Sequence, residues 1–531
     1  MRWILSPLAV LVMAACAGEQ RPATSLAVAA IGEPASVLPP LAYETVARDI
    51  GDLVFERLAT LEPGEAPLDA RAYRPALATR WDRVDSLTLR FHLRPGARWH
   101  DGAPVTAHDV VFSFEAYADT LLAAAAQYAI GGRVSAEAAD DSTVLVRFAE
   151  SSPEQFYDAT WHVRVLPRHI WQEVPRDQWA ADTSVGRLVG SGPYRISAWD
   201  RGTSLALEAD TLRPESLRPA IARLVWRFTA DPDAAVNLVL SGEADLLESI
   251  GAPDRIARVA ADSTLQVVRY PSAVYGFAGF RIGQGRTAHP ILADRSVRRG
   301  LSMAIDRRAI ATNAYGADAA VPDGPMSALL WVGDDGLVTL PFDPDSSARV
   351  LEAAGWRAGS DGVRRRAGQR LAFEILVPSS SPSRRQAAVA LQEMWRQVGA
   401  AAEVTALEFP VFQERLANGN FDVYIGAYLD EPSARGLADQ WGTSGIGVLN
   451  HGEYRNPAFD SLLAAAGRAG ERTRAQALYH EALDTLNADA AAIYLYTPMQ
   501  AAAVRRTVGN VTIDPYSWLS RLPDWTLAGS R

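Results

Sequence analysis

The chain has 531 residues, of which 48% are hydrophobic and 21% charged, and its formal net charge is -10. This length exceeds one ordinary domain and predicts two or three hydrophobic cores in a protein of ordinary soluble composition. Lysine occurs nowhere, which excludes a P-loop lysine, a Schiff base and a pyridoxal phosphate anchor. The acidic balance, without a clustered basic surface, argues against a nucleic acid partner.

The N-terminus has the pattern of a bacterial export signal. A charged residue precedes an apolar run, and the 13 residues from Trp3 to Ala15 are too few to cross a bilayer, which takes about 20. Met13–Cys16 is similar to a lipobox, with Met in place of the usual Leu. We therefore expect a signal peptide over 1–15, a lipid on Cys16 and a polar tether over 16–25, with plain secretion as the alternative.

The most informative stretch lies between residues 80 and 117. Alternating apolar residues over 87–93 predict a strand with one buried face, and residues 94–96, Arg-Pro-Gly, predict a turn. Thr106 and Asp109 have the spacing of a capping box before a helix with one apolar face. We expect four residues of this stretch in the core: Phe91, Leu93, Val111 and Phe114.

Other segments carry strand or helix periodicity along the rest of the chain. In order, we expect a strand over 26–31, a helix over 50–61, a βαβ unit over 221–247, a strand-like crossing over 267–280, a helix over 297–310 and a β, α, β, α, β run over 373–427. The last run predicts a parallel sheet with helices on its faces.

Three motifs carry a resemblance to a known family. They are FHLRPGARWHDGAPVTAHDVVFSFE over 91–115, GSGPY over 190–194 and DPDAAVNLVLSGEADLL over 231–247. Together they resemble the family 5 extracellular solute-binding proteins, which are the peptide, nickel and oligosaccharide receptors of ABC importers. The resemblance extends from about residue 32 to about residue 527, and it departs from the family at Pro39, where the family has Asp.

The resemblance implies an α/β protein with the two-lobed periplasmic-binding-protein type II fold and an extra subdomain in the first lobe. Lobe I would comprise residues 26–268 and 498–531, with the subdomain inserted at about 69–187. Lobe II would comprise residues 269–497. Closure of the lobes by hinge motion would select the ligand-bound state.

The family builds its binding cleft from aromatic and charged residues near the crossings between the lobes. Carried onto this sequence, the resemblance implies six ligand-binding candidates: Tyr275, Arg281, Tyr428, Asp430, Trp441 and Tyr496. Packing is the alternative role for Tyr275 and Tyr496, and a surface cap is the alternative for Trp441.

Two of these candidates bear on the class of ligand. Tyr428 stands where peptide receptors of the family have an Asp that holds the peptide ammonium, and Arg281 stands where they have an Asn. A buried ammonium without a charged partner is costly, so we expect a larger or more acidic ligand in place of a free peptide amine. Asp430 is the competing candidate for the vacant role.

The sequence offers no credible catalytic set. Residues 283–288 fit a dinucleotide fingerprint in form, but a His-Pro pair follows where a helix should begin, and G-x-S-x-G is absent. His92, His100 and His108 recur at a spacing that matches no metal site. His451 is the one histidine retained as a ligand candidate, and packing is its favoured interpretation. We expect no enzyme activity, no cofactor and no metal.

The combined expectation is a monomeric, lipid-anchored solute-binding protein in the periplasm or on the cell surface. It would capture a small organic ligand, peptide-like or other, and deliver it to the permease subunits of an ABC importer. Two alternatives stay open: a secreted hydrolase on a related scaffold, and a receptor that senses its ligand without transport.

The first prediction concerns the anchor. Cys16 is the only cysteine, which excludes an intramolecular disulfide, and acylation would remove a free thiol from an oxidising compartment. Cys16→Ser should therefore abolish labelling by radioactive palmitate and release the protein from the membrane pellet. A variant that still pellets like the wild type would show that the anchor lies elsewhere.

Overall fold

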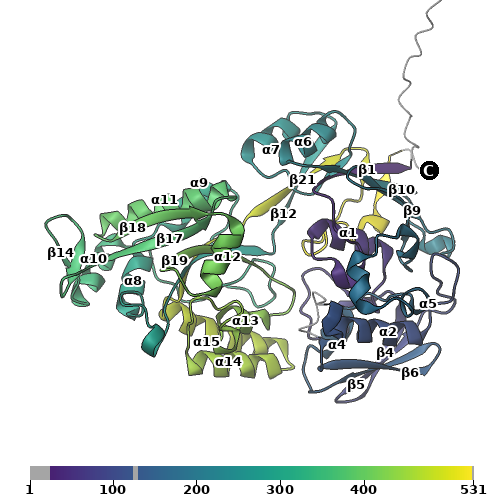
Figure 1. Ribbon diagram of the computed structural model, residues 1–531, viewed down its shortest axis with the longest axis horizontal. Helices are drawn as coiled ribbons and strands as arrows, with labels where there is room; N and C mark the ends of the chain where they lie inside the picture. Colours follow the sequence, from purple (N-terminus) through teal and green to yellow (C-terminus); the bar gives the residue numbers. More distant parts are fainter. Residues whose placement is uncertain (1–23, 123–129, 529–531) are drawn as a thin grey trace, which may run out of the picture.

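The structure is a computed structural model that describes residues 24–122 and 130–528. It contains two lobes, each organised around its own β-sheet with helices on the faces (Figure 1). This arrangement confirms the predicted α/β class and the two lobes. The predicted signal peptide and Cys16 lie outside the described residues, and none of the described helices is long and apolar enough to span a bilayer.

A seven-stranded sheet forms the centre of the first lobe. In order across the sheet its strands are β12 (Leu265–Pro271), β21 (Met499–Arg505), β11 (Leu246–Leu247), β1 (Ser25–Ile31), β10 (Arg223–Thr229), β9 (Ser204–Ala209) and β8 (Tyr194–Asp200). Strand β1 is parallel to both neighbours, and its residues 26–30 are all buried. A continuous apolar strand of this kind requires cover on both faces of the sheet.

One face of this sheet is covered by two short helices, α6 (Pro232–Leu240) and α7 (Pro253–Ala260). Val236 and Val239 belong to one small cluster with Ala27 and Ala29 of β1. Leu26 and Val28 alternate with these residues and belong instead to the large cluster on the opposite face. The predicted βαβ unit over 221–247 is present as β10, α6 and β11.

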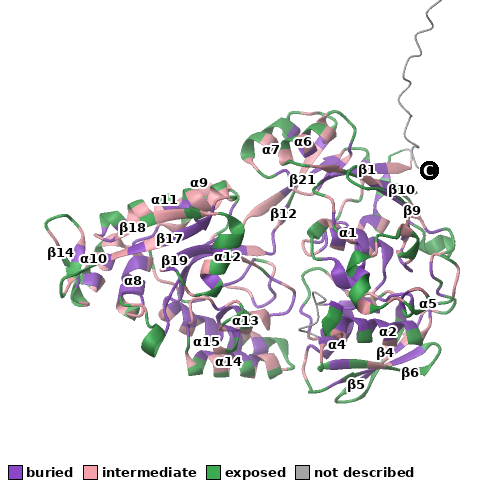
Figure 2. Ribbon diagram, in the orientation of Figure 1, coloured by how far each residue is buried: buried purple, intermediate pink, exposed green. Residues whose placement is uncertain are grey.

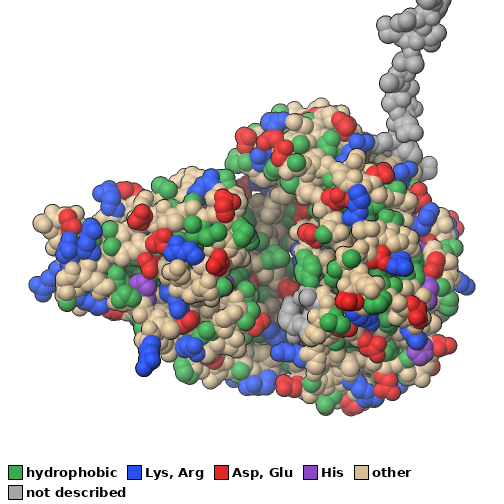
Figure 3. All heavy atoms as spheres, viewed as in Figure 1, with side chains coloured by type: hydrophobic (Ala, Val, Ile, Leu, Met, Phe, Trp, Pro, Cys, Tyr) green, Lys and Arg blue, Asp and Glu red, His purple; other side chains and the backbone are tan. Residues whose placement is uncertain are grey.

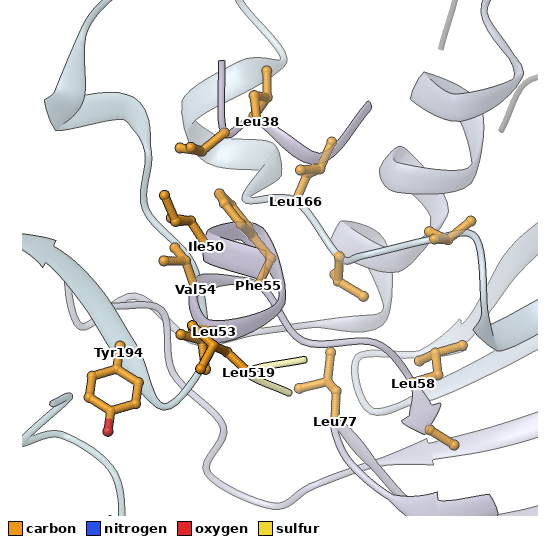
Figure 4. Packing of buried hydrophobic residues seen from close by; sticks show 14 of the residues in the cluster. Leu38, Ile50, Leu53, Val54, Phe55, Leu58, Leu77, Leu166, Tyr194 and Leu519 are labelled. Carbon is orange, nitrogen blue, oxygen red and sulfur yellow. The ribbon is translucent and has the colours of Figure 1, made fainter. Parts of the chain in front are cut away.

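Helix α1 (Thr45–Val54) belongs to that large cluster, where Ile50, Leu53 and Val54 point into the apolar core (Figure 4). The GSGPY motif packs against the end of this helix. A Cβ atom on Gly190 would lie 1.8 Å from the Val54 carbonyl oxygen, and the Gly192 N–H donates a hydrogen bond of 2.8 Å to the same oxygen. Glycine is required here because any larger residue would push the motif off the helix.

The most informative stretch forms part of a subdomain with a four-stranded antiparallel sheet. Its strands, in order, are β4 (Ala78–Asp85), β5 (Thr88–Leu93), β7 (Thr143–Phe148) and β6 (Val134–Asp140). Helix α2 (Ala107–Ala118) begins with the predicted capping box, in which the Thr106 N–H donates to Asp109 Oδ2 at 2.8 Å. The short helices α4 (Gln155–Thr160) and α5 (Arg168–Trp171) complete this region.

The second lobe contains a five-stranded sheet in the order β18 (Ala401–Leu407), β17 (Ala372–Pro378), β19 (Val423–Leu429), β13 (Val274–Phe280) and β20 (Ala492–Tyr496). Strands β18, β17 and β19 are parallel as predicted, whereas β13 is antiparallel to β19 and β20, so the sheet is mixed. Its helices are α8 (Arg295–Met303), α9 (Arg307–Tyr315), α10 (Pro344–Ala353), α11 (Pro382–Gln397), α12 (Phe409–Ala417), α13 (Gly436–Trp441), α14 (Pro457–Arg468) and α15 (Arg472–Ala488). The buried strands lie between these helices (Figure 2).

Two crossings join the lobes. Strand β12 ends in the first sheet at Pro271 and β13 begins in the second at Val274, while β20 ends at Tyr496 and β21 returns at Met499. The crossings lie side by side, since the Ser272 N–H donates to the Pro498 carbonyl oxygen at 3.3 Å.

Two predicted helices differ from the structure. The helix expected over 50–61 ends at Val54, because Phe55 is extended and residues 59–61 pair as strand β2 (Ala59–Leu61) with β3 (Tyr73–Pro75). The helix expected over 297–310 is broken into α8 and α9. Asp306 accepts a hydrogen bond of 2.9 Å from the Ala309 N–H and so starts a new helix, a capping signal that the sequence contained.

Three of the four predicted core residues of the informative stretch, Phe91, Leu93 and Phe114, are buried, and Val111 is half-buried. Phe114→Ala should therefore lower the free energy of unfolding by about 3–5 kcal/mol, measured by urea denaturation. Leu121→Ala is the matched control, because this leucine is 69% exposed and its truncation should change stability by less than about 0.5 kcal/mol. Equal stability of Phe114→Ala and the wild type would contradict the core assignment.

Candidate functional site

A cavity of about 460 Å³ lies where the two lobes meet, and the surface is visibly hollowed between them (Figure 3). The first lobe contributes residues of α1, residues 161–164, residues 248–249 and residues 515–518. The second lobe contributes Val274 and residues 429–431, and the crossings contribute Ser272 and Ala273. A ligand in this cavity would therefore touch both lobes and the hinge.

Asp52 forms ion pairs with two arginines on the first-lobe wall of the cavity. The carboxylate Oδ1 lies 2.6 Å from Arg164 Nε and 3.3 Å from Arg57 Nη2, and Oδ2 accepts a hydrogen bond of 2.8 Å from Ser517 Oγ. Burial raises the pKa of Asp52, but Arg164 and Arg57 outweigh this effect and hold the pKa at about 2. Asp52 is therefore ionised at neutral pH, with its charge already compensated.

Asp49 lies one helical turn before Asp52 and has a different environment. Asp49 is only 3% exposed, and Trp518 lines the same cavity. Burial raises the pKa of Asp49 well above its usual range, and the neighbouring carboxylate of Glu248 raises it further. Burial likewise raises the pKa of Glu248 to about 7, and Arg48 only partly opposes this rise.

The second lobe also places a carboxylate, Asp430, in the cavity. Asp430 is 6% exposed, and its Oδ2 accepts a hydrogen bond of 2.6 Å from the Ser327 N–H. Its own N–H donates to the Ala273 carbonyl oxygen at 2.8 Å, which fixes it beside the crossing. Burial raises the pKa of Asp430 to about 7. Asp430 is the one predicted site residue among those that line the cavity.

A cluster of charged side chains connects the lobes next to the cavity. Arg435 of the second lobe lies with its Nε 2.6 Å from Glu154 Oε2 of the first lobe and also pairs with Asp158 of α4. Ser433 Oγ donates a hydrogen bond of 2.5 Å to Glu154 Oε2. Glu154 and Asp158 are 2% and 8% exposed, so this contact excludes most water.

Three of the predicted site residues lie together in the core of the second lobe and outside the cavity lining. The Tyr275 hydroxyl donates to Gln440 Oε1 at 2.7 Å and accepts a hydrogen bond of 3.0 Å from Trp441 Nε1. Tyr428 is opposite Tyr275 in the sheet and donates its hydroxyl hydrogen to the Leu449 carbonyl oxygen. Because β13 and β19 present these side chains on the face covered by the α13 segment, they pack against each other.

Tyr496 and Arg281 also lie outside the cavity lining. The Tyr496 ring stacks on Tyr315 with centroids 3.5 Å apart. Arg281 follows the far end of β13, seven residues from Val274, and its Nη2 is 3.0 Å from Glu453 Oε1. The expectation of an acidic ligand loses the support of Arg281, because this arginine pairs with Glu453 outside the cavity lining. His451 packs edge-on against Tyr424, with ring centroids 6.0 Å apart.

Sequence reasoning missed most of the charged wall of the cavity. Asp52 lies in the segment that was expected to be helical and Asp49 just before it, three residues apart on a helix whose Ile50, Leu53 and Val54 are apolar. A pair of acids beside the apolar stripe is a weak signal, because such residues are usually solvated. Glu248 directly follows β11, and the end of a buried strand is a frequent position for ligand contacts.

Several known proteins are similar to this chain over almost its whole length. Protein XP55 of Streptomyces lividans is 26% identical over 478 residues, which cover 89% of this chain and 83% of XP55. The oligopeptide-binding protein AppA of Bacillus subtilis is 23% identical over 523 residues, which cover 96% of this chain and 93% of AppA.

Solved structures agree with the observed fold. The ABC transporter substrate-binding protein CtaP of Listeria monocytogenes superposes with a TM-score of 0.81 at 23% identity, covering 95% of this chain and 99% of CtaP. The AppA structure, in complex with a nonapeptide, gives a TM-score of 0.75 at 22% identity, covering 95% of this chain and 99% of AppA.

The family model described as bacterial extracellular solute-binding proteins, family 5 middle, matches residues 72–446. This range includes the informative stretch, the glycine motif and most of the second lobe. With two lobes, a cavity between them and this match, the resemblance noted in the sequence is confirmed: the chain belongs to family 5 of the bacterial extracellular solute-binding proteins.

Proposed function

We propose that this protein is the receptor of an ABC importer and captures a small, peptide-like organic ligand between its lobes. The observation that carries the proposal is the cavity lined by both lobes and by the crossings that join them. Its volume, about 460 Å³, is within the range of roughly 300–1,000 Å³ that is usual for small-ligand sites. A ligand that contacts both walls stabilises the closed arrangement more than any open one.

The relatives support peptides as the ligand class. AppA is named an oligopeptide-binding protein, and its structure holds a nonapeptide. The cavity of this chain combines aromatic side chains, including Trp161, Tyr270 and Trp518, with both signs of charge. Such a wall suits the mixture of apolar and polar groups that a short peptide presents.

The proposal includes the position of the protein in the cell. The family is extracellular by name, and Cys16 follows an apolar run with small residues before it, so we place the protein outside the cytoplasm on a lipid anchor. We further propose that it acts as a monomer and delivers its ligand to permease subunits. The polar residues after Cys16 would serve as the tether.

Hinge closure would rest on the contact between Arg435 and the two carboxylates of Glu154 and Asp158. Burial raises the pKa of both carboxyls, and Arg435 opposes that rise, so the arginine offsets part of the cost of removing the two acids from water. Because the arginine belongs to one lobe and both acids to the other, this energy is available only in the closed arrangement.

The proposed function is tested by a thermal-shift screen of dipeptides to pentapeptides against oligosaccharides and dicarboxylates. We expect peptides to raise the melting temperature and the other classes to leave it unchanged. A hit can then be checked by native mass spectrometry of the freshly purified protein. Stabilisation by oligosaccharides alone would show that the protein binds another class of solute.

Arg435→Gln should favour the open arrangement, because it leaves two buried carboxylates without their partner. Breaking a buried ion pair costs about 3–5 kcal/mol, and the 34% exposure of the Arg435 side chain lowers the expected cost to about 2–3 kcal/mol. Small-angle X-ray scattering should show a larger radius of gyration for the variant. Arg468→Gln, an exposed change in the same lobe, is the control, and identical scattering from both variants would contradict the closing role.

A further inference from the structure

Glu248 and Asp49 are an unusual pair among the charges of the cavity. Both line it, and they come from two separate segments, the end of β11 and the middle of α1. In the described part of the chain, neither carboxylate forms an ion pair, whereas Asp52 is held by two arginines. Asp49 is 3% exposed, so water solvates it poorly.

The protein itself compensates this pair only in part. Arg48 lines the same cavity and attracts both carboxylates, but it lies outside ion-pair distance of either. The Tyr270 hydroxyl donates to the Glu248 carbonyl oxygen at 3.1 Å and so is directed to the backbone. Asp49 is buried and Glu248 half-buried, and the two carboxyl groups face one arginine, so a positively charged group from outside the protein can match them.

We propose that Asp49 and Glu248 form the subsite for a positively charged group of the ligand. This inference rests on the proposed function and adds the chemistry that the captured molecule must carry. The shared chemistry is an ammonium or a guanidinium, which a peptide supplies either at its N-terminus or on a basic side chain. The site lies on the first lobe, away from Tyr428, so it can hold such a group without an acid at that position.

The surroundings favour an organic cation over a metal ion. The described residues include no group of three or more His, Cys, Asp or Glu side chains that could hold a metal, and a pair of carboxylates provides too few ligands. Aromatic residues instead surround the site, since Tyr270, Trp161 and Trp518 line the same cavity. Aromatic rings attract ammonium and guanidinium groups by cation-π interaction.

The binding test uses four probes that separate the possible sources of charge. They are trialanine, N-acetyl-Ala-Arg-Ala amide, N-acetyl-trialanine amide and agmatine, each measured by isothermal titration calorimetry at pH 8. We expect trialanine or the arginine peptide to bind and the neutral peptide to bind at least about tenfold more weakly. Glu248→Gln and Asp49→Asn should each remove this preference. Glu215→Gln, an exposed carboxylate in the same lobe, should preserve it.

Failure of the subsite and failure of the proposed function give different results. Equal affinity for the charged and neutral peptides, or unchanged affinity for the charged ones in both variants, overturns the subsite while the function stands. If no peptide binds but agmatine binds the wild type and neither variant, the subsite stands and the peptide function fails. If no probe binds, both are overturned.

A second measurement requires no ligand. The pKa of Glu248 is about 7 in the folded protein, so between pH 4.5 and 7 the folded state holds a proton that the unfolded chain has released. The wild type should therefore lose stability as pH rises through this window. The ionisable groups that interact with Glu248 are Arg48, Asp49 and Tyr270, and Asp52 lies beside Asp49. Glu248→Gln should have a higher melting temperature than the wild type at pH 8 and a flatter pH profile. A variant that is less stable than the wild type at pH 8 would show that the carboxylate is already compensated.

Discussion

The two strand crossings between the lobes are the constraint on which the rest of this structure depends. Strands β12 and β21 pair along their full length in the first sheet, from Leu265 opposite Arg505 to Pro271 opposite Met499. Their continuations, β13 and β20, pair again in the second sheet. Only residues 272–273 and 497–498 lie between the two sheets, so any motion between the lobes must bend these short segments. The cavity lies against the same segments, which couples its occupancy to the angle between the lobes.

The acidic residues that line the cavity differ in their partners, and this difference separates those that stabilise the fold from those available to a ligand. Asp52 is surrounded by Arg57, Arg164 and Ser517, and its environment supports folding at neutral pH. Asp49 is buried and Glu248 half-buried without comparable partners, which costs folding energy that a positively charged ligand group would recover under our proposal. Charged groups left unmatched in a cleft are typical of binding sites, where stability is reduced in favour of function.

Strand alternation explains why most of the predicted site residues pack in the core. The first crossing was expected within residues 267–280, and aromatic residues do lie on both strands that meet beyond it. However, Tyr275 and Tyr428 are directly opposite each other and share one face, which α13 covers through Trp441. Residues at the ends of these strands, such as Val274 and Asp430, line the cavity instead. A sequence gives the strand but not which of its faces a later helix will cover.

The sequence by itself determined the family, the α/β class with two lobes and the core of the informative stretch. These depend on local patterns: alternating strands, the capping pair Thr106 and Asp109, and glycines that must approach a helix end closely. The tertiary structure alone decided which charges meet. Asp49 and Glu248 are 199 positions apart in the numbering, and Arg435 is 281 from Glu154. No periodicity links such residues, because their proximity results from how sheets and lobes pack, and that packing sets both the burial and the pairing of each charge.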